Sequence, residues 1–174
     1  MTDLLADFRH EFKRHKSAVD RAMSQLSDGQ FFERPAAHVN SVAIIVKHLS
    51  GNLVSRWTDF LTSDGEKPWR DRDREFVISP HDTRAALLAE WDGGWQAVFD
   101  TLASLSANDL EKTVTIRGEP HTAHQALLRG LDHVAYHTGQ ILYLVRLLCP
   151  DSPWLSIAPG ESRTQPGQYR KPVE

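Results

Sequence analysis

The sequence has a single cysteine, no long apolar run and no excess of basic residues, and each of these shortages excludes a class of protein. Cys149 has no partner within the chain for a disulfide, which fits a reducing compartment such as the cytoplasm. Twenty Lys and Arg residues against 23 Asp and Glu residues give a formal net charge of −3, so there is no basic stripe to neutralise phosphates. The composition therefore argues against a nucleic-acid-binding protein.

A membrane or secreted protein is also not indicated. The first residues, MTDLLADFRHEFKRHK, are charged throughout and lack the apolar centre of a signal peptide. No apolar run elsewhere is long enough to cross a bilayer. The chain has 174 residues, 40% hydrophobic and 25% charged, which is typical of a globular domain that folds without disulfides or a structural metal. We expect a cytoplasmic protein that does not bind membranes.

Apolar residues recur at helical spacing in four segments, and no segment shows sustained strand alternation. The expected helices, with the residues that bound them, are about 4–26, closed by Asp28 and Gly29; about 42–61, after Asn40 and Ser41; about 80–102, capped by Ser79 with Pro80 in the first turn; and about 122–148, stopped by Pro150. Gly93 and Gly94 inside the third helix predict a close helix contact or a bend, since glycine costs about 1 kcal/mol there relative to alanine.

The link between the second and third helices is long enough to cross the whole fold. About 17 extended residues reach about 55 Å, whereas a 20-residue helix is only about 30 Å long, so these two helices can run parallel. We therefore expect an all-α fold, a four-helix bundle with long crossover loops, in residues 1–150. A short extended pair is expected in 112–122, turning at Arg117 and Gly118, and a proline-containing C-terminal arm in 151–174.

Two histidines in the last helix, His133 and His137, lie four residues apart in DHVAYHTGQ. Positions i and i+4 share one face of a helix, so both rings can reach one point in space. The pair is either two separately hydrogen-bonded core histidines or half of a metal site. A metal site needs a third ligand from another element.

The best third candidate is His48, inside the apolar stretch IIVKHLSGNLVSRW. Asn52 and Arg56 follow it at i+4 and i+8, so the three residues form a polar line along one face of the helix, which a helix buried only for packing does not need. A single histidine there can also be a hydrogen-bonded core residue. If the second and fourth helices are neighbours, His48 can join His133 and His137 around one ion. Three ligands with an open position are typical of a catalytic site, and imidazole suits zinc, nickel, copper and iron. We expect a divalent transition metal, zinc or nickel first.

Asn52 and Arg56 on this line, and further polar residues, are candidates for substrate binding. Gln140 follows His137 by three residues and can either orient a histidine or a metal-bound water, or form an interhelix hydrogen bond. The alternating run RDRDRE at 70–75 is either a solvated, internally paired loop or a cover over the open metal face. In the second case Arg56, Arg72 or Arg74 could bind an anionic substrate, because guanidinium groups match carboxylates and phosphates.

The stretches NSVAIIVKHLSGNLVSRWTDFLTSDGEKPWRDRDREF, TIRGEPHT and RGLDHVAYHTGQILYL, and more loosely WLSIAPGES, resemble the DinB-like (YfiT-like) superfamily of four-helix metalloproteins. The superfamily includes bacillithiol transferases and mycothiol-dependent maleylpyruvate isomerases, and the match is to a bacterial branch of it. The resemblance implies a bundle with long crossovers, often a homodimer. It also implies a metal held by one histidine of the second helix and an HxxxH pair of the fourth, which match His48, His133 and His137.

Three functions fit these observations. The first is a metal-dependent enzyme that transfers a low-molecular-weight thiol to a small electrophile, as the resemblance implies, or that hydrolyses a small molecule. No Glu or Asp stands beside HVAYH as in the HExxH motif of zinc hydrolases, which favours thiol transfer. The second is a non-catalytic metal-binding or dimerisation module, and the third is a packed bundle without metal.

Overall fold

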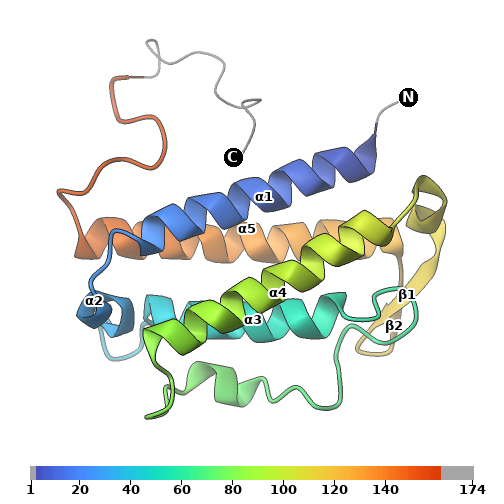
Figure 1. Cartoon of the computed structure of the whole chain (residues 1–174), viewed down its shortest axis with the longest axis horizontal. Helices are drawn as coiled ribbons and strands as arrows, with labels where there is room; N and C mark the ends of the chain where they lie inside the picture. Colours follow the sequence, from blue (N-terminus) through green and yellow to red (C-terminus); the bar gives the residue numbers. More distant parts are fainter. Residues whose placement is uncertain (1–2, 162–174) are drawn as a thin grey trace.

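Four long helices lie side by side and shorter elements connect them (Figure 1). The computed structural model describes residues 3–161, which are mostly helical with one small sheet. The elements are α1 (Leu4–Met23), α2 (Asp28–Phe32), α3 (Val42–Trp57), the 3₁₀ turn η1 (Asp73–Phe76), α4 (Arg84–Ser104), the 3₁₀ turn η2 (Ala107–Glu111), β1 (Thr113–Ile116), β2 (Glu119–Thr122) and α5 (Ala123–Leu148).

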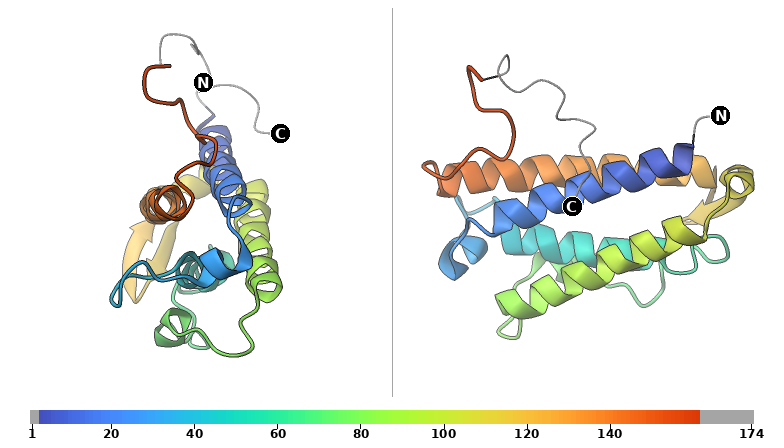
Figure 2. Two further views of the ribbon diagram at one scale, coloured as in Figure 1. Left: turned by 90° about the vertical axis from the view of Figure 1, so that its left-hand side faces the viewer. Right: turned by 45° about the horizontal axis from the view of Figure 1, so that its top comes forward.

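The long helices form two pairs: α1 and α5 run in one direction, and α3 and α4 run in the opposite direction (Figures 1 and 2). Arg84, at the start of α4, donates to the carbonyl of Met23, at the end of α1 (2.7 Å), so α1 and α4 are antiparallel. Thr101, near the end of α4, donates to the carbonyl of Trp57, at the end of α3 (2.8 Å), so α3 and α4 are parallel. The prediction that the second and third long helices run parallel is confirmed.

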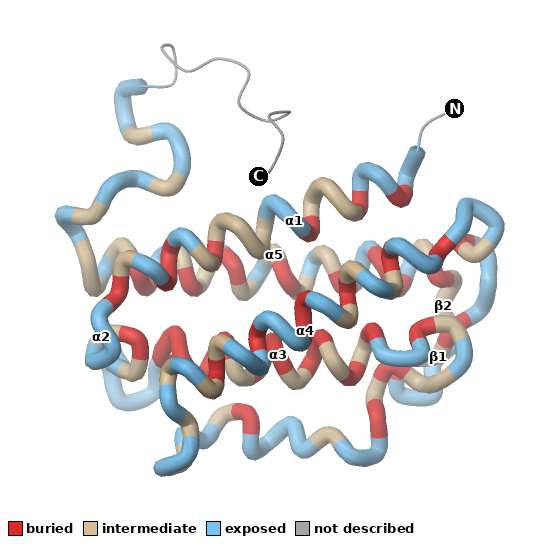
Figure 3. The backbone as a smooth tube through the Cα atoms, viewed as in Figure 1, coloured by how far each residue is buried: buried red, intermediate tan, exposed pale blue. Residues whose placement is uncertain are grey.

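Large aromatic side chains fill the space between the helices, and the buried residues lie on their inward sides (Figure 3). The Phe12 ring of α1 packs edge-on against Trp57 of α3, with ring centroids 5.1 Å apart, and against Trp95 of α4, at 6.2 Å. Full burial of a side chain such as Phe12 contributes about 1.5–3 kcal/mol. The apolar periodicity of the sequence therefore identified the core faces correctly.

Gly94 lets α3 and α4 approach closely. A Cβ atom at this position would lie 3.2 Å from Leu53 Cβ and 3.2 Å from the Ser50 carbonyl oxygen of α3. The close contact expected from the glycine pair is confirmed at Gly94, whereas Gly93 has nothing within 4 Å of its Cβ position.

Three predicted helix boundaries are wrong. Asp28 and Gly29 do not merely close α1; they lie in the separate helix α2, which Ser27 caps with a capping box. Helix α3 ends at Trp57 and not near Leu61, because Asp59 takes a left-handed conformation (φ 50°) and turns the chain.

The third error concerns the start of α4, which Thr83 caps, not Ser79. Asp82 accepts from the backbone N–H of Ser79 (2.6 Å) and from Lys47 of α3 (2.8 Å), and so holds the preceding turn against α3. Ser41 caps α3, as predicted, and Thr122, the predicted start of the last helix, is the residue that caps α5.

The extended pair predicted before the last helix is present as the hairpin of β1 and β2. Its turn residues Arg117 (φ 56°) and Gly118 (φ 76°) are both left-handed, as tight hairpins require. Asp64 of the α3–α4 crossover accepts from the N–H groups of Arg117 and Gly118, each at 2.8 Å. Burial raises the pKa of Asp64, but these donors and that of Glu66 outweigh it and lower the pKa to about 2. Asp64 therefore ties the crossover to the hairpin as a carboxylate.

The first part of the predicted C-terminal arm lies against α1 and α5. Arg21 of α1 donates to the carbonyl of Leu155 (3.5 Å), and the Arg146 guanidinium of α5 lies 4.2 Å from the Trp154 ring centroid. The remainder of the predicted arm, 162–174, lies outside the described residues. Within 3–161, no helix has the length and apolarity needed to span a membrane.

Candidate metal centre

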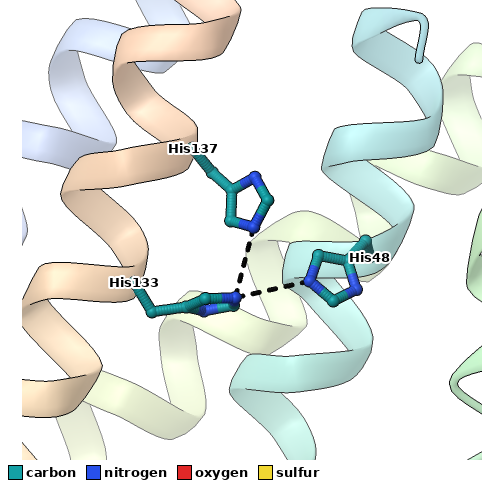
Figure 4. A group of neighbouring side chains, drawn as sticks. All are labelled: His48, His133 and His137. Carbon is teal, nitrogen blue, oxygen red and sulfur yellow. Dashed lines mark hydrogen bonds between the residues drawn. The ribbon is translucent and has the colours of Figure 1, made fainter. Parts of the chain in front are cut away.

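Helices α3 and α5 bring the three predicted histidines together (Figure 4). His133 Nε2 lies 3.4 Å from His48 Nε2 and 3.2 Å from His137 Nε2, and one nitrogen of each ring lies within 4.8 Å of the others. His48 is 4% exposed and the other two are half-buried. The expected convergence of an HxxxH pair on one helix with a histidine of another is therefore found.

In His48 and His137 the outer nitrogen, Nδ1, points away from the group and is hydrogen-bonded. This leaves the inner nitrogen, Nε2, which faces the group, with a lone pair. His48 Nδ1 donates to Glu75 Oε2 (2.8 Å), and His137 Nδ1 donates to Gln140 Oε1 (2.8 Å). In a neutral imidazole the second nitrogen then has no proton and is an acceptor. The Nε2 atoms of His48 and His137 both face the Nε2 of His133, and one N–H on His133 cannot serve both acceptors well.

Burial keeps the two α5 histidines uncharged. It lowers the pKa of His133 to about 3, with further contributions from His137, His48 and two arginines. Burial also lowers the pKa of His137 to about 4, even though Gln140 opposes the shift. Both rings are therefore neutral near pH 7, the form in which histidine binds metals.

The geometry and chemistry of the group fit a transition-metal ion. Nitrogens bound at about 2.0–2.1 Å to a tetrahedral zinc lie about 3.3 Å apart, close to the two nitrogen distances found here. The outer hydrogen bonds of His48 and His137 are those that usually orient metal-binding imidazoles. Three histidines also leave a fourth position for water or a substrate. The group could thus hold a metal ion.

Glu75 is the main partner that the sequence did not reveal. It comes from η1 in the α3–α4 crossover, and its carboxylate accepts from His48 and, through both oxygens, from Arg70 (2.8 and 2.9 Å). Burial raises the pKa of Glu75, but these hydrogen bonds outweigh it and lower the pKa below its usual value. The carboxylate fits because Gly51 has no side chain, since a Cβ there would lie 2.9 Å from Glu75 Cδ.

The RDRDRE run divides between the two roles considered for it. Arg70 and Glu75 form a buried pair, and the Arg70 side chain is only 2% exposed. The Arg74 side chain is 87% exposed, pairs with Asp71 and does not line the cavity described below, so its predicted role in anion binding is not supported. Phe76, at the end of the run, packs on the His48 ring (4.8 Å between centroids). The crossover therefore does lie against the histidine group.

A cavity of about 210 Å³ adjoins the histidines. Nine residues line it: His48, Asn52, Arg56, Arg70, Arg72, Arg117, Arg129, Gly130 and His133. The predicted residues Asn52, Arg56 and Arg72 thus lie beside the group, and the fourth, Gln140, contacts it through His137.

Arg129 and Arg117 were missed, and a signal for Arg129 was present. It precedes His133 by four residues, so Arg129, His133 and His137 form a line on α5 that mirrors His48, Asn52 and Arg56 on α3. No sequence pattern relates Arg117 to this site, because the hairpin brings it there. His121 of β2 accepts from Arg129 (3.1 Å) at this edge.

The fold and site define a class: a mainly helical protein with three converging histidines between two antiparallel helices. The sequence matches the family described as "Protein of unknown function (DUF1572)" over residues 1–161, and the chain belongs to this family.

A solved structure described as a conserved protein from Enterococcus faecalis is similar in fold. It shares 14% sequence identity with a TM-score of 0.64, and the alignment covers 86% of this chain and 99% of the other. At this identity the likeness concerns the fold alone. No curated protein matches the chain.

Proposed function

We propose that this protein is a metal-dependent enzyme of the DinB-like four-helix-bundle type, in which His48, His133 and His137 hold a divalent transition metal, zinc or nickel. The observation that carries the proposal is the meeting of three imidazoles, with the Nε2 atoms of His48 and His137 facing that of His133, beside a cavity that His48 and His133 line. The four long helices and the crossover between α3 and α4 support the bundle type.

We infer that the reaction is transfer of a small thiol to an electrophile. A divalent metal supplies Lewis acidity, which lowers the pKa of a bound thiol from about 8.5 or that of a bound water towards about 7. The thiol loses its proton to solvent, its sulfur forms a bond to the electrophilic carbon, and the leaving group departs with the electrons of the broken bond.

The described residues favour thiol transfer over hydrolysis. No Asp or Glu is among the residues that line the cavity. Glu75, the nearest acid to His48, already accepts from His48 and Arg70, so it is not free to act as the general base that a zinc hydrolase uses. A thiolate needs no such base for its attack. Asn52, Arg56 and Arg72 from the cavity wall, and Gln140 through His137, are proposed to position the substrate.

The metal is tested first by its content in protein purified without a histidine tag. We expect about one zinc or nickel ion per chain in the wild type and in His81→Ala, a variant of an exposed histidine, and loss of the ion in His48→Ala. The helical circular dichroism of His48→Ala should persist, because a core of this size does not need the ion to fold. Unfolding of this variant would instead indicate a structural metal.

Activity is tested by mixing the metal-loaded protein with small cellular thiols and with aryl halide or epoxide electrophiles. The wild type should accelerate thiol consumption, and His133→Ala should not. Equal rates in both proteins would contradict the enzyme proposal and leave a non-catalytic metal-binding module.

A homodimer is also proposed, and the outer face of α5 supports it. Tyr136 and Tyr143, seven residues apart on one side of the helix, are 63% and 72% exposed, and Leu147 continues the same face at 54%. Light scattering should give a dimer mass that Tyr143→Glu reduces to the monomer mass.

A further inference from the structure

The cavity beside the histidines is strongly cationic. Five of its nine lining residues are arginines, contributed by α3, the crossover, the hairpin turn and α5, and no lining residue is acidic. A cavity that gathers five guanidinium groups from four separate elements differs from a solvated surface charge run. Because like charges repel, such a gathering favours an anion among them.

Two of the arginines are neutralised by the protein itself. Arg70 pairs with Glu75 and Glu66, at 2.8 and 3.2 Å, and Arg117 pairs with Glu66 at 3.3 Å. These contacts account for both carboxylates that approach the cavity arginines within ion-pair distance among residues 3–161.

The other three, Arg56, Arg72 and Arg129, make no ion pair within the described chain. The Arg72 guanidinium lies over the Phe76 ring, 5.1 Å from its centroid, and Arg129 donates to the neutral acceptor His121. Arg56 Nε is buried without a hydrogen-bond partner. Burial, together with repulsion from Arg129 and Arg70, lowers the pKa of Arg56 to about 10. The surroundings therefore destabilise the positive charge of Arg56.

The antiparallel arrangement of α3 and α5 gives the cavity two chemically different ends. On α3 the line runs from His48 through Asn52 to Arg56, and on α5 it runs in the opposite sense, from His133 back to Arg129. One end therefore presents imidazole nitrogens and the other presents guanidinium groups. Gly65 of the crossover helps to fix the second end, because a Cβ there would lie 2.9 Å from Arg56 Cδ.

We propose that Arg56, Arg72 and Arg129 form a binding site for the carboxylate or phosphate group of a small anionic substrate, whose reactive end then lies at the histidines. The placing of the reactive end at the histidines rests on the proposed function, whereas the binding of an anion by the three arginines does not depend on it. The cavity volume of about 210 Å³ suits a small metabolite.

The test is calorimetric titration of the purified protein with inorganic phosphate and with succinate, at low and constant ionic strength. We expect saturable binding of at least one probe, and the preferred probe distinguishes a phosphate site from a carboxylate site. Arg129→Gln should weaken binding about tenfold or more, since a hydrogen bond to a charged group typically contributes that much. Arg129 is exposed, so this variant should remain folded, and Arg56→Gln provides a second, half-buried replacement.

The matched control is Arg74→Gln, which removes an arginine of the same crossover that does not line the cavity. It should bind the anion as the wild type does. Equal affinities for wild type and Arg129→Gln, or equal losses in Arg129→Gln and Arg74→Gln, would overturn the proposal.

Two further measurements separate this inference from the metal proposal. His133→Ala should lose the metal and still bind the anion, and Arg129→Gln should keep its metal content. Loss of anion binding in His133→Ala with all arginines intact would show that the metal holds the anion, which overturns the arginine site. A wild type without metal that still binds the anion through Arg129 would overturn the proposed function alone.

Discussion

Helix α3 lies between two interfaces that differ in almost every respect. Towards α4 it packs closely along its length, and Gly94 allows contact with the backbone of Ser50. Towards α5 it presents His48, Asn52 and Arg56 to the histidines and a cavity. The first interface is apolar and filled, and the second is polar and partly open.

The difference shows where stability and function reside. An apolar, close-packed interface stabilises the fold through burial and dispersion. Neutral imidazoles with unsatisfied nitrogens and unpaired guanidinium groups at an interface do the opposite, because buried polar groups without partners cost free energy. The α3–α5 interface is therefore best explained as a ligand site, and the other helix contacts provide the stability that it lacks. Variants at the α3–α4 interface should change stability, and variants at the α3–α5 interface should change ligand binding.

The largest effect is expected from Phe12→Ala, in the apolar core. Phe12 is fully buried between Trp57 and Trp95, so its removal should lower the free energy of unfolding by about 3–5 kcal/mol, measured by urea denaturation. The metal content of the folded fraction should not change. Glu90→Ala, on the exposed side of α4, should alter stability by no more than about 0.5 kcal/mol, and similar losses in both variants would contradict this assignment of the core.

The next effect concerns the polar side. Glu75→Gln keeps the shape of the side chain but removes the charge that orients His48, and should weaken metal affinity about 10–100-fold, measured by competition with a chelator. Glu66→Gln is the matched control, because Glu66 also contacts Arg70 but does not contact His48. If both variants retain wild-type affinity, Glu75 does not act on the site through His48.

Much of the fold was predictable because apolar spacing is local information. The four long helices, the parallel relation of α3 and α4, the hairpin and the Gly94 contact all follow from periodicity, link length and glycine placement. The boundaries at α2 and α4 were not predictable in this way, because other plausible capping residues lie close to Ser27 and Thr83 in the sequence, and Asp82 holds the turn before α4.

The site was predictable where its residues share a helical line, and not where tertiary structure supplies them. His48, His133 and His137 follow from i, i+4 spacing and a polar line, and Arg129 extends that logic by one turn. Glu75 and Arg117 come from a crossover and a hairpin turn, whose positions depend on contacts such as those of Asp64 with the turn backbone. In RDRDRE, alternation alone does not separate the buried Arg70 from the exposed Arg74.

The polar interface should also make the metal-free protein sensitive to acid. The folded-state pKa values of His133 and His137, about 3 and about 4, lie below the ordinary value of 6.5. The unfolded chain therefore binds protons first, so stability is fully present above about pH 6.5 and falls as the pH decreases towards about 4. The slope is at most about 1.4 kcal/mol per pH unit for each histidine.

Denaturation of metal-free protein between pH 7 and pH 5 measures this slope. The double variant His133→Gln and His137→Gln should show a shallower dependence. Some dependence should remain, because burial also lowers the pKa of His15. An unchanged slope in the double variant would show that these two rings do not control acid sensitivity.

The smallest effects should come from single methyl groups placed at the two interfaces of α3, one at Gly94 of α4 and one at Gly51 of α3. Gly94→Ala meets the Ser50 backbone and Leu53 Cβ, which cannot move easily, and should lower stability with unchanged metal affinity. Gly51→Ala meets the Glu75 carboxylate, the end of a flexible side chain, so it should move Glu75 away from His48 and weaken metal binding more than stability. Gly93→Ala, an exposed position of α4 with nothing within 4 Å, should raise stability by about 0.5–1 kcal/mol and serves as the control for helix propensity. If Gly51→Ala keeps wild-type metal affinity while Gly94→Ala loses it, the division of α3 into a stabilising face and a ligand-binding face is wrong.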